Sequence, residues 1–270
     1  MNARTASLGM YDHPAQGDAN DRLWTAIAHR LRAEGLTDVP DRLDRTRDVH
    51  ATWRDPGLLL GQACGYPLVA DPTLALHVLA LPDYAAPGCV AAMHSSIVVA
   101  RIDDARGSLD DFRGGRAAIN DRQSNTGMNL FRATVAPIAG RVAFFADVIE
   151  TGSHRASVVA VGEGRADIAA IDCVTYAALS RFEPGLTAPL RIVAESPPSP
   201  TLPFVTAAGT DRATVAILRR TLDAVMADPA LDEVRATLFL AGVVAADDAV
   251  LATVRALEAD AVRAGYAELR

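Results

Sequence analysis

The chain has 270 residues, of which half are hydrophobic, and its formal net charge is −7. This length allows one large domain or two domains of moderate size, and the acidic charge argues against a general nucleic-acid-binding protein. All 26 basic residues are arginine. Walker-type phosphate loops and Schiff-base enzymes are therefore excluded, because both need a lysine.

Neither targeting nor membrane segments are expected from the sequence. The first residues contain no apolar stretch of the kind that signal peptides carry. The longest uncharged run, residues 84–100, contains Pro87 and Gly88, so it does not read as a membrane-spanning helix. We expect a soluble chain without a membrane span.

The three cysteines, Cys64, Cys89 and Cys173, are far apart in the sequence and form no CxxC pair. A zinc ribbon, a thioredoxin-like motif and a disulfide framework are therefore not supported. Each cysteine has small or apolar neighbours, and we expect buried structural thiols.

The first part of the chain predicts strands around one long helix. Residues 6–11 favour a strand, and residues 19–34 place apolar side chains on one helical face before Gly35. Residues 58–69 and 74–81 are apolar enough for buried strands or their approaches. Residues 95–101 predict a further strand.

The middle of the chain alternates strands with helices. The predicted order is strand 116–120, helix 127–136, strand 142–150, helix 153–163, strand 166–172 and helix 173–182. Residues 190–196 and 202–208 predict two more strands, and the chain from Asp211 onward reads as almost wholly helical. This alternation indicates an α/β protein with mostly parallel sheets.

Polar residues follow each of the three strands in this middle segment. The first strand is followed by Ser124, Asn125, Thr126 and Gly127, the second by residues 151–154, and the third ends at Asp172. If these strands are parallel neighbours, two helix N-termini meet at one sheet edge, where backbone N–H groups and helix dipoles favour an anion. The alternative is plain helix capping, in which nothing binds.

The order of these motifs resembles a known family. The segments "SLGMYD" (7–12), "CGYPL" (64–68), "DFRGGRAAINDRQSNTGMN" (111–129), "GSHRASVVAVGEGRADIAAID" (152–172) and "LRIVAESPPSPTLPFV" (190–205) look like those of the phosphate-, phosphite- and phosphonate-type substrate-binding proteins of ABC importers. The resemblance spans nearly the whole chain.

The resemblance implies an α/β, two-lobed, type II periplasmic binding protein fold with two crossovers. Lobe one would comprise residues 1–95 plus 200–270, and lobe two residues 96–195. A small oxyanion, phosphate- or phosphonate-like, would bind in the cleft between lobes that close about a hinge. The chain would act as a monomer beside an ABC permease, without a cofactor or metal. The family implies the periplasm, but with no export signal in view a cytoplasmic location stays open.

The resemblance also assigns roles to residues. Ser124, Asn125, Thr126 and Gly127 would cradle the oxyanion, and Ser153 and His154 would contact it from the next helix start. The first-lobe side would be lined by Tyr11 and Tyr66, and Ser95 with His94 would lie at a crossover. For His154 and the two tyrosines a core or capping role is the alternative. Asp172 either lines the pocket or caps the helix that follows it.

Enzyme readings have little support in the sequence. No G-x-S-x-G, HExxH or paired-cysteine motif is present, so no catalytic residue is assigned. An enzyme or a cytosolic sensor that uses the same two-lobed fold remains the alternative, because a fold does not determine its function.

Overall fold

The computed structural model describes residues 4–270, and the chain divides into two compact units. The first unit comprises residues up to Ala85, residues 90–92 and residues 200–251. The second comprises residues 86–89, 93–199 and 252–270. Three two-residue strands lie where the chain passes from one unit to the other, namely β4 (Cys89–Val90), β5 (Met93–His94) and β11 (Ser199–Pro200).

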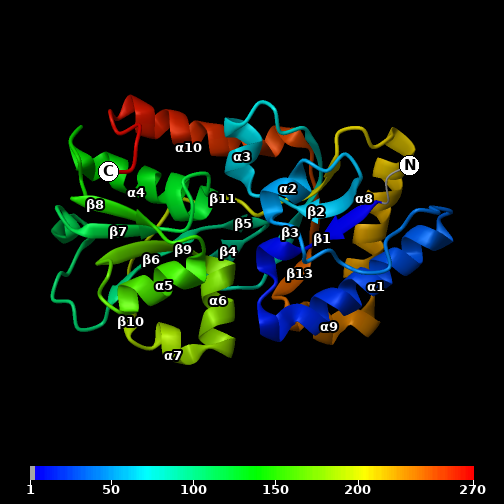
Figure 1. The fold of residues 1–270 in the computed structure, drawn as a ribbon, viewed down its shortest axis with the longest axis horizontal. Helices are drawn as coiled ribbons and strands as arrows, with labels where there is room; N and C mark the ends of the chain where they lie inside the picture. Colours follow the sequence, from blue (N-terminus) through cyan, green and yellow to red (C-terminus); the bar gives the residue numbers. More distant parts are fainter. Residues whose placement is uncertain (1–3) are drawn as a thin grey trace. The chain divides into compact units, whose positions relative to one another are not determined.

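A five-stranded sheet forms the centre of the first unit (Figure 1). Its strand order is β1 (Thr5–Ser7), β2 (Leu58–Gln62), β12 (Phe204–Ala207), β3 (Leu76–Tyr84) and β13 (Leu240–Ala245). The β1–β2 pair is parallel and the other three pairs are antiparallel.

Helices cover this sheet because each presents an apolar stripe to it or to a neighbour. In α1 (Gly17–Ala33), Leu23, Trp24, Ile27 and Leu31 recur at helical spacing and are buried. This helix packs against α8 (Arg212–Met226) and α9 (Asp232–Thr237), and α8 also contacts β3 and β13. Two short helices, α2 (Val49–Trp53) and α3 (Gly65–Ala70), flank β2 along the chain.

The second unit also contains a five-stranded sheet. Its order is β10 (Leu190–Glu195), β6 (Ser96–Arg101), β9 (Ile168–Asp172), β7 (Arg116–Ile119) and β8 (Asp147–Glu150). The neighbours β9, β7 and β8 are parallel, whereas β6 runs antiparallel to both β9 and β10. The carboxyl ends of three strands therefore lie at the same sheet edge.

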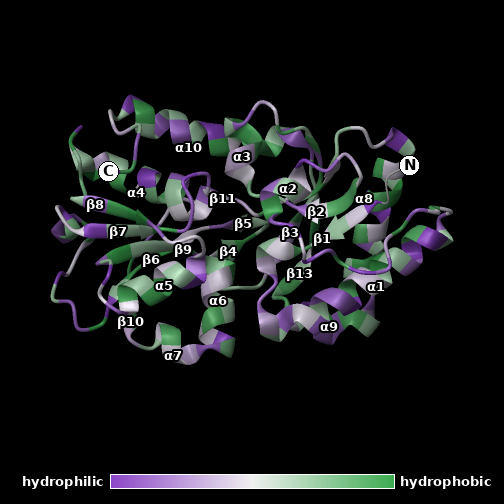
Figure 2. Ribbon diagram, in the orientation of Figure 1, coloured by the Kyte–Doolittle hydropathy of each residue, from purple (hydrophilic) through white to green (hydrophobic). Residues whose placement is uncertain are grey.

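The helices of this unit lie on both sheet faces (Figure 1). They are α4 (Leu130–Ala139), α5 (His154–Gly162), α6 (Cys173–Phe182) and α7 (Pro184–Thr187), and most of α10 (Leu251–Arg263) also belongs to this unit. Figure 2 shows the strands in mainly hydrophobic colours and α10 with hydrophilic and hydrophobic residues mixed along it. The continuous apolar runs of β6 and β9 follow from burial on both faces.

The α/β fold class and the alternating elements of the middle segment are confirmed. The prediction of mostly parallel sheets was wrong, because most strand pairs of the described residues are antiparallel. Several predicted bounds were wrong as well. The chain leaves β1 after Ser7 and forms a 3₁₀ turn, Gly9–Tyr11, where we predicted continuous strand. Residues 142–146 precede β8 as irregular chain. The prediction of an almost wholly helical end missed β13, whose Val243 and Val244 pair with β3.

The C-terminal segment belongs to the second unit, whereas we had expected it in the first lobe. Tyr266 is buried, and the Arg270 carbonyl accepts hydrogen bonds from the backbone N–H groups of Phe144 and Phe145 at 2.6 and 3.1 Å. Arg132 of α4 donates to the Ala267 carbonyl at 2.7 Å. These contacts attach residues 264–270 to the α4–β8 connection.

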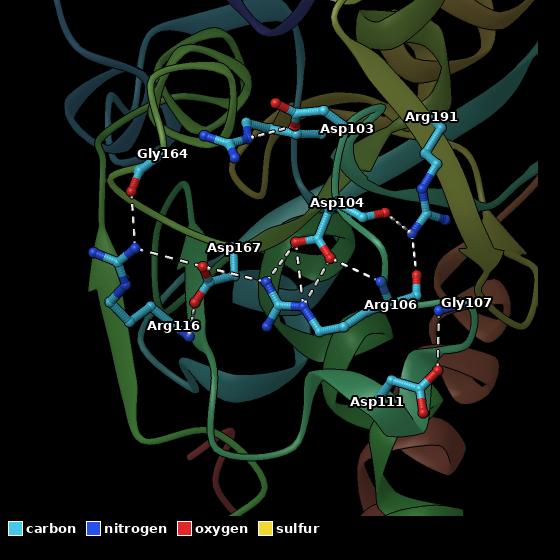
Figure 3. A network of polar contacts seen from close by, with 10 residues as sticks. Asp103, Asp104, Arg106, Gly107, Asp111, Arg116, Gly164, Asp167 and Arg191 are labelled. Atoms are coloured by element: carbon cyan, nitrogen blue, oxygen red, sulfur yellow. Dashed lines mark hydrogen bonds and ion pairs between the residues drawn. The ribbon is translucent and has the colours of Figure 1, made fainter.

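An ion-pair network lies at the opposite end of this sheet, where β7 and β9 begin (Figure 3). Arg106 binds Asp104 with an Nε–Oδ1 distance of 3.0 Å and reaches Asp167 at 3.4 Å. The hydrogen bond from Arg106 lowers the pKa of Asp104 to about 2, against the effect of burial. Asp167 also accepts from the backbone N–H of Arg116 at 2.7 Å. We infer that this network holds the loop of residues 101–107 in place.

Candidate functional site

The candidate site lies at the carboxyl ends of β7, β8 and β9 in the second unit. In open α/β sheets this edge is where ligands bind. The turns after β7 and β8 are joined directly, because the Gly152 N–H donates to the Asn120 carbonyl at 2.9 Å. The parallel order predicted from the sequence is confirmed, and it brings the starts of α4 and α5 together.

The helix after β7 begins with a π-helical turn, Asn125–Asn129, that continues into α4. Ser124 is its N-cap, and the Ser124 hydroxyl oxygen accepts from the Gly127 N–H at 2.9 Å. The Ser96 hydroxyl of β6 donates to the Thr126 carbonyl at 2.8 Å and so holds this turn against the sheet. The first N–H groups of such a helix have no partner within the helix.

Gly127 is the one position of this turn where a side chain does not fit. A Cβ atom there would lie 1.8 Å from Asn120 Oδ1, 2.9 Å from Asn120 Cγ and 3.1 Å from His154 Cε1. The absence of a Cβ therefore lets Asn120 and His154 approach the helix start. Asn120 Oδ1 is buried without a hydrogen-bond partner among the described residues.

The side chain of Asn125 holds the turn in place through buried hydrogen bonds. It is fully buried, donates to Ser199 Oγ at 2.9 Å and accepts from Asn129 Nδ2 at 3.0 Å. Asn129 in turn accepts from Arg132 at 2.7 Å. Because its amide is engaged in this chain of contacts, Asn125 fixes the backbone of the turn, and its contact with a ligand stays a prediction.

The second helix start meets the first through one side-chain contact. Thr126 Oγ1 and His154 Nε2 are 3.0 Å apart, although 28 residues separate them in the sequence. His154 is the first residue of α5, and the Ser153 hydroxyl caps that helix by accepting from the Ala156 N–H at 3.1 Å. The Thr126 hydroxyl, the His154 imidazole and the N-termini of the two helices therefore lie next to one another.

His154 is neutral at physiological pH. Burial lowers its pKa most, the nearby Asp172 acts in the opposite direction, His94 lowers the pKa further, and the Ala170 backbone raises it. A neutral imidazole has one donor and one acceptor nitrogen. Its Nε2 is the nitrogen that lies against Thr126 Oγ1.

Asp172, the last residue of β9, forms a buried pair with His94. Its Oδ1 caps α6 by accepting from the Thr175 N–H at 3.0 Å, and its Oδ2 lies 3.2 Å from His94 Nδ1. Both side chains are almost fully buried, at 2% and 0% exposure. Burial would raise the pKa of Asp172, but the hydrogen bond and charge of His94, with smaller contributions from His154 and Thr175, lower it to about 2.

The register of β6 on β9 explains this pairing. Ser96 lies opposite Asp172 in the antiparallel ladder, so His94, two residues earlier, lies just beyond the end of β9. Ser95 directly follows β5, and its hydroxyl donates to the Gly88 carbonyl at 3.2 Å. The contact of Ser95 with a ligand stays a prediction.

The predicted tyrosines lie in the first unit. Tyr11 packs edge-on against Tyr84 with ring centroids 5.4 Å apart, and the two line a small pocket with Gln62 and Phe204. Gln62 donates to the Tyr84 hydroxyl at 2.9 Å. Tyr66 lies in α3 and is buried. The role of Tyr11 and Tyr66 in ligand binding stays a prediction.

Sequence reasoning did not assign Asn120 or Ser199 to this site. Asn120 is the residue that follows β7, which is a position where ligand-binding side chains are expected. Ser199 lies 74 positions from Asn125, and no local pattern connects them. Within residues 4–270, no cluster of three or more metal-ligating side chains is found, nor a helix long and apolar enough to cross a membrane.

Comparisons with known proteins identify similar folds and a family. No curated protein sequence matches this chain. PhnD1 from Prochlorococcus marinus, solved with methylphosphonate, is similar at a TM-score of 0.74 and 14% identity, covering 95% of this chain and 97% of its own. XAC2383 from Xanthomonas citri, solved with ATP, is similar at 0.71 and 18% identity over 97% and 98%.

A further similar structure is a binding protein component of an ABC phosphonate transporter from Pseudomonas aeruginosa. Its TM-score is 0.72 at 17% identity, with coverage of 91% of this chain and 82% of its own. These likenesses confirm the periplasmic binding protein fold. Residues 62–251 match the model of the phosphonate ABC transporter periplasmic substrate-binding proteins. The chain belongs to this family of transporter substrate-binding proteins, as the order of its motifs had indicated.

Proposed function

We propose that the α4 and α5 starts bind the head group of a phosphonate- or phosphate-like oxyanion. The Thr126–His154 contact at 3.0 Å carries this proposal, because it brings two helix N-termini to one point. Thr126 supplies its hydroxyl and its backbone N–H, and His154 supplies its imidazole. Ser124, Asn125, Gly127 and Ser153 shape and cap the two turns.

The contacts of Asp172 are compatible with an oxyanion ligand that carries no amine. The Asp172 carboxylate would repel an anion, but His94 lies against its Oδ2 and Thr175 engages its Oδ1. Both carboxylate oxygens are therefore engaged by groups of the protein itself. We therefore propose that Asp172 positions His94 and caps α6, and that a ligand amine is not required.

The transport role follows from the family, and its finer features are proposals. We propose that the chain works as a monomer in the periplasm and delivers its ligand to an ABC permease. The methylphosphonate held by the Prochlorococcus marinus protein makes small phosphonates the first compounds to test. Phosphate and phosphite share the same tetrahedral, anionic head group.

A ligand screen tests this proposal by thermal unfolding. A ligand at 100 times its dissociation constant stabilises a protein by about 2.7 kcal/mol, which for this size corresponds to a rise in Tm of about 5–10 °C. We expect that rise with methylphosphonate, phosphite or phosphate, and a smaller one or none with glycine betaine. If no phosphorus oxyanion changes the Tm while a cationic compound does, the proposal is wrong.

A further inference from the structure

Two of the three cysteines lie side by side in the second unit. Cys89 and Cys173 are 84 positions apart in the sequence, yet their Sγ atoms are 3.3 Å from one another. Burial, as predicted for a structural thiol, holds for Cys173, whereas Cys89 is only partly buried. Cys64 belongs to the first unit.

The backbone around the pair holds the two thiols in place. The Ser95 N–H donates to the Gly88 carbonyl at 3.1 Å, and the Cys173 N–H donates to the Ser95 carbonyl at 3.2 Å. Gly88 has φ +88°, and a Cβ there would lie 2.9 Å from Cys173 Cβ. The glycine at position 88 therefore permits the close approach of the Cys89 segment to the first residue of α6.

The two thiols differ in their access to solvent. Cys173 is 1% exposed, whereas Cys89 is only partly buried. Hydrogen bonding with Cys89, burial and the nearby Asp172 all raise the pKa of Cys173. An oxidant in solution therefore meets Cys89 first, and Cys173 reacts afterwards as a neighbouring thiol.

We propose that Cys89 and Cys173 form a reversible disulfide when the protein meets a small disulfide oxidant such as oxidised glutathione. The Cys89 sulfur attacks one glutathione sulfur and releases the first glutathione. The Cys173 sulfur then attacks Cys89 Sγ and expels the second. Two cysteine protons are transferred to the two glutathione thiols, so one protein disulfide forms for each oxidant reduced.

The reaction requires movement only of the two cysteine side chains and their immediate surroundings. The Sγ atoms need to move from 3.3 Å to about 2.05 Å, while Ser95 already links both backbone segments. The bond would tie Cys89, where β4 begins, to the start of α6 beside Asp172 (Figure 1). Because it closes a long loop, it constrains the unfolded chain and raises the melting temperature.

Counting reactive thiols tests the proposal on the full chain. The folded protein is incubated with reduced or oxidised glutathione, quenched in acid, and then denatured and alkylated with N-ethylmaleimide for intact mass. We expect three adducts on the reduced protein and one on the oxidised protein. Peptide mapping should join Cys89 to Cys173 and leave Cys64 alkylated. The oxidised protein should melt about 5–10 °C higher.

The variant C89S is the matched control. It should keep two alkylated thiols after the same oxidation and show no rise in melting temperature. Three adducts on the oxidised wild type would overturn the proposal. A glutathione adduct that persists at Cys89, or a crosslink that includes Cys64, would overturn it as well.

Discussion

Replacing Gly127 by alanine is expected to weaken oxyanion binding on the order of 100-fold, or about 2.7 kcal/mol. The new Cβ would lie 1.8 Å from Asn120 Oδ1 and 3.1 Å from His154 Cε1, so both side chains must move away from the start of α4. Both clashes involve side-chain ends, so the fold should survive with a loss of about 1–3 kcal/mol of unfolding free energy. Titration calorimetry with methylphosphonate measures the affinity.

Two further variants identify the cause of that loss. Gly162→Ala lies in α5, where the added Cβ meets nothing closer than 4.0 Å, and affinity should not change. Combining Gly127→Ala with Asn120→Ala removes the severest clash and should restore part of the affinity if crowding is the cause. An unchanged affinity in Gly127→Ala itself would show that this turn does not hold the ligand.

Asp172→Ala is expected to have the largest effect on stability, a loss of about 3–5 kcal/mol at pH 7. The substitution removes a buried carboxylate, takes away the buried partner that lies 3.2 Å from His94 Nδ1, and removes the α6 cap. Chemical denaturation followed by circular dichroism measures the loss. Asp211→Ala is the control, because Asp211 caps α8 through the Thr214 N–H at 2.9 Å and is solvent-exposed, so a much smaller loss is expected.

The pH dependence of stability separates the two roles of Asp172. Its pKa is about 2 in the folded protein and near 3.8 in the unfolded chain. A carboxyl whose folded pKa is lowered stabilises the fold above the unfolded pKa, and this contribution is lost as the pH falls from about 4 to 2. Asp172→Ala should lack that part of the acid transition. Equal losses of unfolding free energy in Asp172→Ala and Asp211→Ala at pH 7 would show that Asp172 acts only as a helix cap.

The sequence predicted the parts of the site that local pattern determines. Ser124 to Gly127 and Ser153 to His154 could be recognised as helix starts from their small polar residues, and α/β alternation predicted that the strands before them are parallel neighbours. From these two facts the convergence of the two helix starts follows, whereas the contact between Thr126 and His154 was seen only in the structure. The apolar runs that become β6 and β9 were recognised because strands buried on both faces have little polar content.

What the sequence could not predict depends on contacts between distant segments. The strand β13 is short and lies in a helix-rich region, and its pairing with β3 decides its conformation. The support of Asn125 by Ser199 and the approach of Cys89 to Cys173 join residues 74 and 84 positions apart. Attachment of residues 264–270 to the α4–β8 connection has no local signature either, because Arg132 and Phe144 provide the partners.

We propose that Thr126 and His154 bind one oxyanion together, and a double-mutant cycle measured by titration calorimetry is the sharpest test of this. The proteins are the wild type, Thr126→Ala, His154→Ala and the double variant, with methylphosphonate, phosphite and phosphate as ligands. His29→Ala, an exposed histidine of α1, is the control. Each single change should weaken binding by about 1.5–3 kcal/mol, and the double change should cost less than their sum because the two groups act on the same ligand. Wild-type affinity for the best-bound oxyanion in both single variants would contradict the claim.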